Sequence, residues 1–261
     1  MQPTLRLAVL GDPIDHSRSP VIHNAAMRRL GIAGTYEARR AGAPELRLAV
    51  AELRAGSLDG FNVTMPLKGE AFAMAEAVTP EAAKSGSVNT VRHRHGEVEG
   101  HSTDVIASDL AFSDDRFDTN APILILGSGG AAAAALAGAG GRVAYLSSRN
   151  SERAAATAGR VGRKTGLIRF GTGVSGALVV NATPLGMGGE ILPDEVLRSA
   201  SGVIDLAYGD EETLTVSAAR ESGLPVMDGI EFLVLQAAAS FEWWTGLAAP
   251  VEVMLQAARK T

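Results

Sequence analysis

The sequence predicts an α/β protein with two domains. Strand-like apolar runs alternate with helix-like segments along most of the chain, which is typical of parallel sheets with crossover helices. The 261 residues, 46% of them hydrophobic, suffice for one large or two smaller cores. A new strand, glycine turn and helix begins at Ile123, after the polar segment 113–121, which we interpret as a surface entry to the second domain.

The expected elements follow from the apolar pattern and from cap residues. Strands are predicted at residues 5–10, 35–38, 61–64, 123–126, 143–147, 178–181 and 203–206. Ser19 followed by Pro20 is typical of an N-cap and first turn, and that helix should end at Leu30 with Gly31 behind it. We place the domains at residues 1–103 and 104–229, with helices in 230–261 that return to the first domain.

Composition favours a small-molecule ligand over a macromolecular partner. The net charge is −5, and the chain has no extended block of Lys and Arg, so the footprint of a nucleic-acid or anionic-membrane partner is missing. The chain has no cysteine, which excludes disulfides and thiolate metal sites. With no signal peptide and no 18-residue apolar run, we expect a cytoplasmic protein, monomeric or homodimeric.

One lysine follows a predicted strand at a position suited to proton chemistry. Residues 61–64 alternate apolar and polar side chains, Pro66 then interrupts the strand, and Lys68 comes next. In open α/β sheets ligands bind at the carboxyl ends of the strands, where a partly desolvated lysine can donate or accept a proton. The alternative is an exposed lysine at the start of a helix.

The apolar run 123–126 leads directly into Gly127, Ser128, Gly129, Gly130 and Ala131, and then into a helix. Gly127 permits a tight turn, Gly129 lets the backbone approach a pyrophosphate, and Ala132 is small enough for close helix packing. The pattern therefore predicts a dinucleotide site at the start of this helix. Without the flanking strand and helix, it would predict only a tight connection.

The end of the next predicted strand favours NADP over NAD. NAD enzymes usually place an acid there for the ribose 2′-hydroxyl, whereas this chain has Ser148 and Arg149. Arg149 can pair with a 2′-phosphate, and Arg153 adds a second positive charge one helical turn later. The alternative is two solvated arginines at a helix start.

Several motifs follow one another along the full chain in an order and spacing that resemble those of one family. They lie at residues 11–24, 61–68, 87–90, 102–104, 181–187, 205–208, 235–237 and 241–246. Together with the glycine turn, they closely resemble the shikimate dehydrogenases. The resemblance implies an amino-terminal substrate domain, a Rossmann NADP domain and carboxyl-terminal helices that return to the first domain. It also implies reversible, NADPH-dependent reduction of 3-dehydroshikimate to shikimate in aromatic amino acid (chorismate) biosynthesis.

The resemblance also assigns roles. It makes Lys68 and Asp104 the catalytic pair, with Lys68 the stronger candidate for the proton transfer, and implies a substrate site formed by Ser17, Ser19, Thr64, Asn89, Tyr208 and Gln236. The residues expected around the cofactor are Gly127, Ser128, Gly129, Gly130, Ala131, Ser148, Arg149, Arg153, Thr183, Leu206 and Gly229.

Two residues beside Asp104 depart from the family pattern. Ser102 stands where Asn is usual, and Ala107 stands where Gly is usual, so its methyl group would resist a positive φ or a close backbone approach if the family's Gly serves either purpose. These departures keep open a paralogue that acts on quinate or a related cyclitol acid. A separate alternative is a non-catalytic sensor of NADP or a metabolite, against which stand Lys68 and Asp104, since a binding module needs no paired acid and base. The five histidines are too scattered to predict a metal site, although His93 and His95 could share one strand face.

Overall fold

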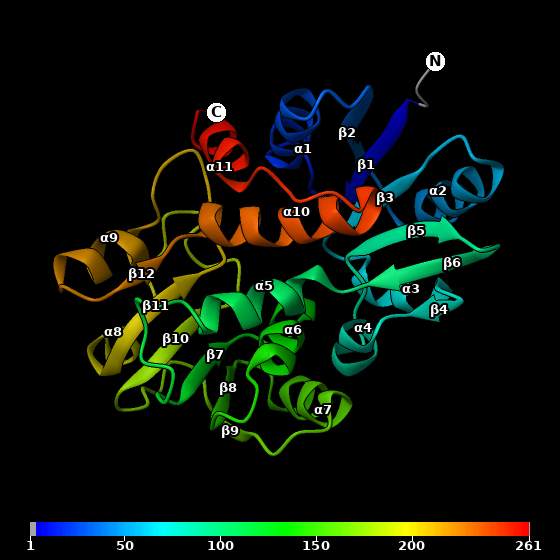
Figure 1. Cartoon of the computed structure of the whole chain (residues 1–261). Helices are drawn as coiled ribbons and strands as arrows, with labels where there is room; N and C mark the ends of the chain where they lie inside the picture. Colours follow the sequence, from blue (N-terminus) through cyan, green and yellow to red (C-terminus); the bar gives the residue numbers. More distant parts are fainter. Residues whose placement is uncertain (1–3, 261) are drawn as a thin grey trace. The chain divides into compact units, whose positions relative to one another are not determined.

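The computed structural model describes residues 4–260, which form two compact α/β units (Figure 1). The first unit contains residues 4–103 and 233–260, and the second contains residues 104–232. Each unit has its own six-stranded sheet, which confirms the predicted fold class.

The sheet of the first unit has the order β2-β1-β3-β5-β6-β4. β1 (Leu5–Gly11) lies between β2 (Gly34–Arg40) and β3 (Gly60–Val63), and these three strands are parallel. The rest is a hairpin of β5 (Thr90–Arg94) and β6 (Glu97–His101), which joins β3 antiparallel, with β4 (Ala77–Val78) at the edge.

The expectation of purely parallel sheets is therefore wrong for this unit. The hairpin turns at His95 and Gly96, whose φ angles are 55° and 85°. His95 consequently lies in the turn and not on a strand face with His93, and the two do not form the pair considered from the sequence. The polar residues of this hairpin concealed its strands because only one of its faces is buried.

Helices α1 (Ser19–Arg29), α2 (Ala43–Ala55), α3 (Lys68–Met74) and α4 (Pro80–Ser85) complete the amino-terminal part of this unit. α1 ends as expected, with Leu30 at the C-cap and Gly31 at a φ of 67°. Its start differs, since Arg18 occupies the N-cap and Ser19 is the first helical residue. α11 (Val251–Arg259) packs beside α1 (Figure 1), so the two ends of the chain share one core.

The sheet of the second unit is entirely parallel, with the order β12-β11-β10-β7-β8-β9. Its strands are β7 (Ile123–Leu126), β8 (Ala144–Ser148), β9 (Gly166–Arg169), β10 (Ala177–Asn181), β11 (Ala200–Asp205) and β12 (Val226–Met227). Strand order reverses on either side of β7, as in a doubly wound Rossmann fold, so the crevice at the carboxyl ends of β7 and β10 is the expected ligand position.

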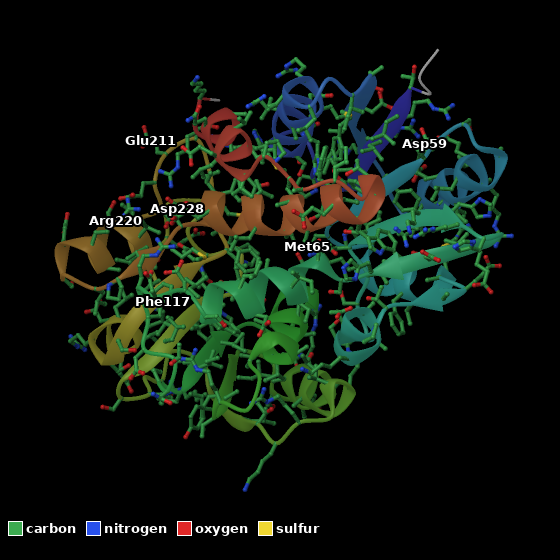
Figure 2. All side chains as sticks on the ribbon, in the orientation of Figure 1. Asp59, Met65, Phe117, Glu211, Arg220 and Asp228 are labelled. Atoms are coloured by element: carbon green, nitrogen blue, oxygen red, sulfur yellow. The ribbon has the colours of Figure 1, made fainter. Side chains whose placement is uncertain are left out.

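The helices of the second unit are α5 (Thr103–Phe112), α6 (Gly130–Gly138), α7 (Ser151–Val161), α8 (Asp194–Ser199) and α9 (Leu214–Glu221). α10 (Gly229–Thr245) begins in this unit and continues into the first. Before α10, an ion pair of 3.5 Å joins Arg220 of α9 to Asp228 (Figure 2).

Segment 113–121 is less superficial than its polar composition suggests. Phe117 is buried, and its ring packs where a Cβ on Gly202 would stand, 2.8 Å from Phe117 Cδ1. Most residues of this segment are exposed, as expected, while Phe117 packs against Gly202 of β11. Within residues 4–260, no helix is long and apolar enough to span a membrane.

Candidate functional site

In the first unit, several of the expected site residues follow the carboxyl ends of β1 and β3. Thr64 comes just after β3 and donates its backbone N–H to Leu10 O at 2.9 Å, while Lys68 is the half-buried first residue of α3. A Cβ at Gly11 would overlap Thr64 Cγ2, so glycine at the end of β1 is needed for this close approach. The carboxyl edge of the sheet therefore carries a hydroxyl and an ammonium group.

Ser17 and Ser19 lie at the amino terminus of α1. The N–H of Ser17 donates to Ile14 O at 2.9 Å, and the N–H of Ser19 lies 3.4 Å from Ser17 Oγ. Between them, the buried Arg18 side chain donates to Ala258 O at the end of α11 (2.6 Å). This contact attaches the serine loop to the carboxyl-terminal helix, and helix N-termini attract anions.

Asn89 and Gln236 are brought together, with Asn89 Nδ2 3.3 Å from Gln236 Oε1. Asn89 is buried just before β5, whereas Gln236 is half-buried in α10. Thr103 donates its backbone N–H to Asn89 Oδ1 at 2.8 Å, which fixes which way the Asn89 amide faces. Two amides from distant parts of the sequence thus meet at one point.

Sequence reasoning missed a set of buried polar residues behind these amides. Its members are Tyr36, Asn62, Thr90, Thr103 and Ser240, all of them at most 6% exposed. Asn62 was noticed only as part of the strand pattern, and no sequence signal indicated Ser240, because a serine within a helix is usually solvated.

His23 lies next to this set, stacked on Tyr36 with ring centroids 4.3 Å apart. Both of its ring nitrogens are buried and have no hydrogen-bond partner among the described residues. Complete burial therefore lowers the pKa of His23 to about 3, and the ring is neutral at pH 7. Its role in the site is packing beneath the polar set.

In the second unit, the glycine turn joins β7 to α6 as predicted. Gly127 has a φ of 123°, and a Cβ there would lie 2.7 Å from Ala182 O, so only glycine fits. Gly129 is the N-cap of α6, and a Cβ there would meet no atom within 4 Å. Ala132 is fully buried in the helix that follows. The space beside Gly129 at the start of α6 is open, which fits a phosphate at this helix N-terminus.

The end of β8 carries the residues that favoured NADP. Ser148 Oγ donates to Ser128 Oγ at 3.1 Å, which brings these two expected cofactor residues together. Arg149 and Arg153 are exposed, and the Arg149 guanidinium carbon lies 4.8 Å from the centre of the Phe170 ring. Asn150 caps α7 by accepting from the N–H of Arg153 (2.8 Å). These hydroxyls and cations fit a 2′-phosphate.

The other expected residues of the second unit lie near the ends of β10 and β11. Thr183 Oγ1 donates to Asn181 Oδ1 at 2.6 Å, and Leu206 N–H donates to Asn181 O at 3.1 Å. Tyr208 is half-buried just beyond. A Cβ at Gly229 would overlap Ala207 O, so Gly229 is fixed closely against the segment that contains Leu206 and Tyr208.

Asp205 is a buried carboxyl group that the sequence analysis did not single out. Asn181 Nδ2 and Thr213 Oγ1 donate to its two oxygens at 2.8 and 2.6 Å, and Ala207 N–H donates at 3.0 Å. Burial raises the pKa of Asp205, although the three donors oppose that rise. Asp205 therefore holds together the loops after β10 and β11. A signal was present, because Asn181 and Asp205 each end an apolar strand.

Asp104 lies in the first turn of α5 and is buried, like Val105 and Ala107 after it. Ala107 is an ordinary helical residue, and His95 alone among the non-glycine residues of 4–260 has a positive φ. Ala107 therefore does not adopt the positive φ that its methyl group would resist. Ser102 Oγ is buried without a hydrogen-bond partner among the described residues. No group of three or more metal-binding side chains occurs within the described range.

Comparison with known proteins identifies two matching family profiles. The shikimate dehydrogenase substrate binding domain matches residues 9–91, and the shikimate 5′-dehydrogenase C-terminal domain matches residues 229–259. The first profile contains Ser17, Ser19, Thr64, Lys68 and Asn89, and the second contains Gln236.

Similar proteins match over nearly the whole chain. "Shikimate dehydrogenase (NADP(+))" of Methanothrix thermoacetophila is 39% identical over 97% of this chain and 96% of its own length. A shikimate 5-dehydrogenase from Thermus thermophilus, solved in complex with NADP(H) and shikimate, superposes with a TM-score of 0.89 at 35% identity, covering 98% and 99% of the two chains. The enzyme from Mycobacterium tuberculosis superposes with a TM-score of 0.83 at 32% identity, covering 99% of both chains.

Proposed function

The chain belongs to the shikimate dehydrogenase family, and on that premise we propose that it reversibly reduces 3-dehydroshikimate to shikimate with NADPH. This reaction is a step of aromatic amino acid (chorismate) biosynthesis. The observation that carries the proposal is the pairing of the Asn89 and Gln236 amides in a unit that also presents Lys68 at the carboxyl edge of its sheet. We place the protein in the cytoplasm, as a monomer or homodimer.

Residues 1–103 and the carboxyl-terminal helices in 230–261 form the substrate domain in this proposal, and residues 104–229 form the cofactor domain. Ser17 and Ser19 bind the substrate carboxylate through hydroxyl groups near a helix amino terminus, which avoids burial of a full positive charge. Thr64, Asn89, Tyr208 and Gln236 bind the ring hydroxyls. A polyhydroxylated ring needs several short polar side chains of this kind.

Lys68 and Asp104 act on the proton of the reacting oxygen. Reduction of the ketone builds negative charge on that oxygen, so a donor must deliver a proton as the charge develops. Lys68 supplies this proton and takes it back in the reverse reaction. Asp104 orients the lysine ammonium group and stabilises its charged form.

The cofactor residues fit NADP better than NAD. The N–H groups at the start of α6 and the Ser128 hydroxyl receive the pyrophosphate, and Gly129 leaves space for its approach. Ser148, Arg149 and Arg153 hold the 2′-phosphate, since no acid ends β8. Thr183, Leu206 and Gly229 shape the remainder of the site. NADPH supplies the hydride when it is bound.

Initial rates test the reaction, the acid substrate and the cofactor together. Purified protein is assayed with shikimate or quinate, each with NADP⁺ or NAD⁺, and nicotinamide reduction is followed by absorbance. We expect fast turnover with shikimate and NADP⁺. A clear preference for quinate would indicate the paralogue, for which Ser102 beside Asp104 is the first residue to exchange, to Asn. Absence of turnover with either acid, in protein that still binds NADP⁺, would indicate an altered substrate or a sensor.

A further inference from the structure

Ser240 connects α10 to three other parts of the first unit. Its side chain is fully buried, and its Oγ lies 3.1 Å from Asn62 Nδ2, 2.9 Å from Thr90 Oγ1 and 3.0 Å from Thr103 Oγ1. It also lies 2.9 Å from Gln236 O, one turn earlier in the same helix. A single hydroxyl group thus contacts Asn62 in β3, Thr90 in β5 and Thr103 just after β6.

The amide of Asn62 begins this chain of hydrogen bonds and sets its direction. The Tyr36 hydroxyl donates to Asn62 Oδ1 at 2.6 Å, so Asn62 Nδ2 must face inward. There it reaches Thr90 Oγ1 at 2.9 Å and Asn89 O at 3.0 Å. Because Asn62 can only donate on this side, Thr90 accepts from it, and the Thr90 proton is directed either to Ser240 Oγ at 2.9 Å or to Asn89 Oδ1 at 3.2 Å.

The chain of hydrogen bonds ends at the two amides assigned to the substrate. Thr103 donates from its backbone N–H and from Oγ1 to Asn89 Oδ1, at 2.8 and 3.1 Å. Asn89 Nδ2 donates to Thr103 Oγ1 at 2.9 Å and also reaches Gln236 Oε1 at 3.3 Å. Exposure rises along the path, since Asn62, Thr90, Thr103 and Ser240 are buried whereas Gln236 is half-buried.

We propose that Ser240 is a positioning residue for the substrate amides, and this inference rests on the proposed function. With the Ser240 hydroxyl in place, α10 is fixed relative to Thr90 and Thr103, and the Asn89 N–H and Gln236 Oε1 are held in one arrangement. A substrate hydroxyl that enters between Asn89 Nδ2 and Gln236 Oε1 then replaces their 3.3 Å contact and meets a donor and an acceptor that are already in place. Without that hydroxyl, Thr90 and Thr103 lose a shared partner, and the orientation of both amides becomes variable.

Steady-state kinetics of matched variants test this role. Ser240→Ala and the nearly isosteric Thr90→Val each remove one hydroxyl of the path, and Ser85→Ala is the control. Ser85 is also fully buried and bonds to backbone carbonyls of its own helix, but it lies outside the path. We expect the first two variants to raise KM for shikimate by roughly tenfold, the effect of about one hydrogen bond. We expect kcat to stay within about twofold and KM for NADP⁺ to stay unchanged.

The double variant Ser240→Ala/Thr90→Val provides the second test. Because both substitutions interrupt the same path, we expect its KM to resemble that of either single variant and not the product of the two effects. Thermal unfolding of all four variants separates positioning from a general loss of stability. If Ser240→Ala does not fold, the kinetics of Thr90→Val decide the result.

Two outcomes would overturn the inference: an unchanged KM for shikimate in Ser240→Ala or in Thr90→Val, or an equal rise in Ser85→Ala. An inactive wild-type protein would instead contradict the proposed function. In that case, calorimetric titration of shikimate into the wild-type protein and Ser240→Ala still tests the positioning role, since equal affinities would contradict it.

Discussion

The two units present their candidate site residues in opposite ways. In the first unit, neutral amides and hydroxyls are buried or half-buried, and Asn89 is bonded to Thr103 and Gln236. In the second unit, the groups expected to hold a phosphate are exposed arginines and backbone N–H groups at the start of α6.

The difference indicates how substitutions should act in each unit. Buried polar groups share partners, so removal of one changes the orientation of others and the effects are not additive. Exposed cations act almost independently, and solvent limits the contribution of each. Substitutions in the first unit should therefore have coupled effects, whereas substitutions in the second unit should have nearly additive effects.

The largest expected effect is that of Lys68→Ala, which removes a single group with its own chemical role. We expect kcat for shikimate oxidation to fall by roughly 10²- to 10⁴-fold, the usual contribution of a proton-transferring group, with little loss of affinity. The control is Lys84→Ala, on the exposed face of α4. A rate equal to that of the wild type would remove Lys68 from the mechanism.

The glycine turn offers a matched pair that separates folding from cofactor binding. Gly127→Ala forces a side chain to a φ of 123° and against Ala182 O, so we expect the free energy of unfolding to fall by about 1–3 kcal/mol. Gly129→Ala meets no protein atom within 4 Å and should leave that free energy unchanged within about 0.5 kcal/mol.

Gly129→Ala should nevertheless raise KM for NADP⁺, because its methyl group occupies the space left for the pyrophosphate. Chemical denaturation and steady-state kinetics of both variants check this contrast. Equal KM values for NADP⁺ in Gly129→Ala and the wild type would show that the phosphate does not pass over this residue.

Acid should destabilise the first unit through His23. Its pKa is about 3 in the folded protein and about 6.5 when unfolded, so the unfolded chain binds more protons between these values. The free energy of unfolding should therefore keep its full value above pH 6.5. It should decrease as the pH falls toward 3, by up to about 1.4 kcal/mol per pH unit. His23→Phe keeps a ring against Tyr36 and should flatten this slope.

Urea unfolding at several pH values measures this slope, with His16→Gln as the control because His16 is exposed. Burial also lowers the pKa of His101, so His23→Phe should retain part of the acid dependence. If the free energy of unfolding of His23→Phe decreased with falling pH as steeply as that of the wild type, His23 would not be the cause of the acid destabilisation.

The smallest expected effect is that of Arg149→Gln. Because Arg149 is exposed, we expect a rise of roughly tenfold in KM for NADP⁺, about 1.4 kcal/mol, with KM for NAD⁺ unchanged. Arg160→Gln, near the exposed end of α7, is the control. Parallel rises for both nucleotides would argue against a 2′-phosphate contact.

The sequence predicted the parallel part of the fold better than the hairpin. Apolar runs such as Ile123–Leu126 are buried on both faces, so their composition alone indicates a strand. The hairpin of β5 and β6 contains Arg92, His93 and Arg94, and its strands were missed because pairing with β3 stabilises them. The N-cap of α1 was misplaced by one residue, since helix boundaries are only weakly encoded.

The sequence by itself determined the fold class and the glycine turn, because these depend on local periodicity and on backbone freedom. Only the tertiary structure decided that Ser240 contacts Asn62 and Thr90, and that the amides of Asn89 and Gln236 meet. Asn89 and Gln236 are 147 positions apart, and Asn62 and Ser240 are 178 apart. No local pattern encodes contacts over such separations, since packing of α10 on the first sheet creates them.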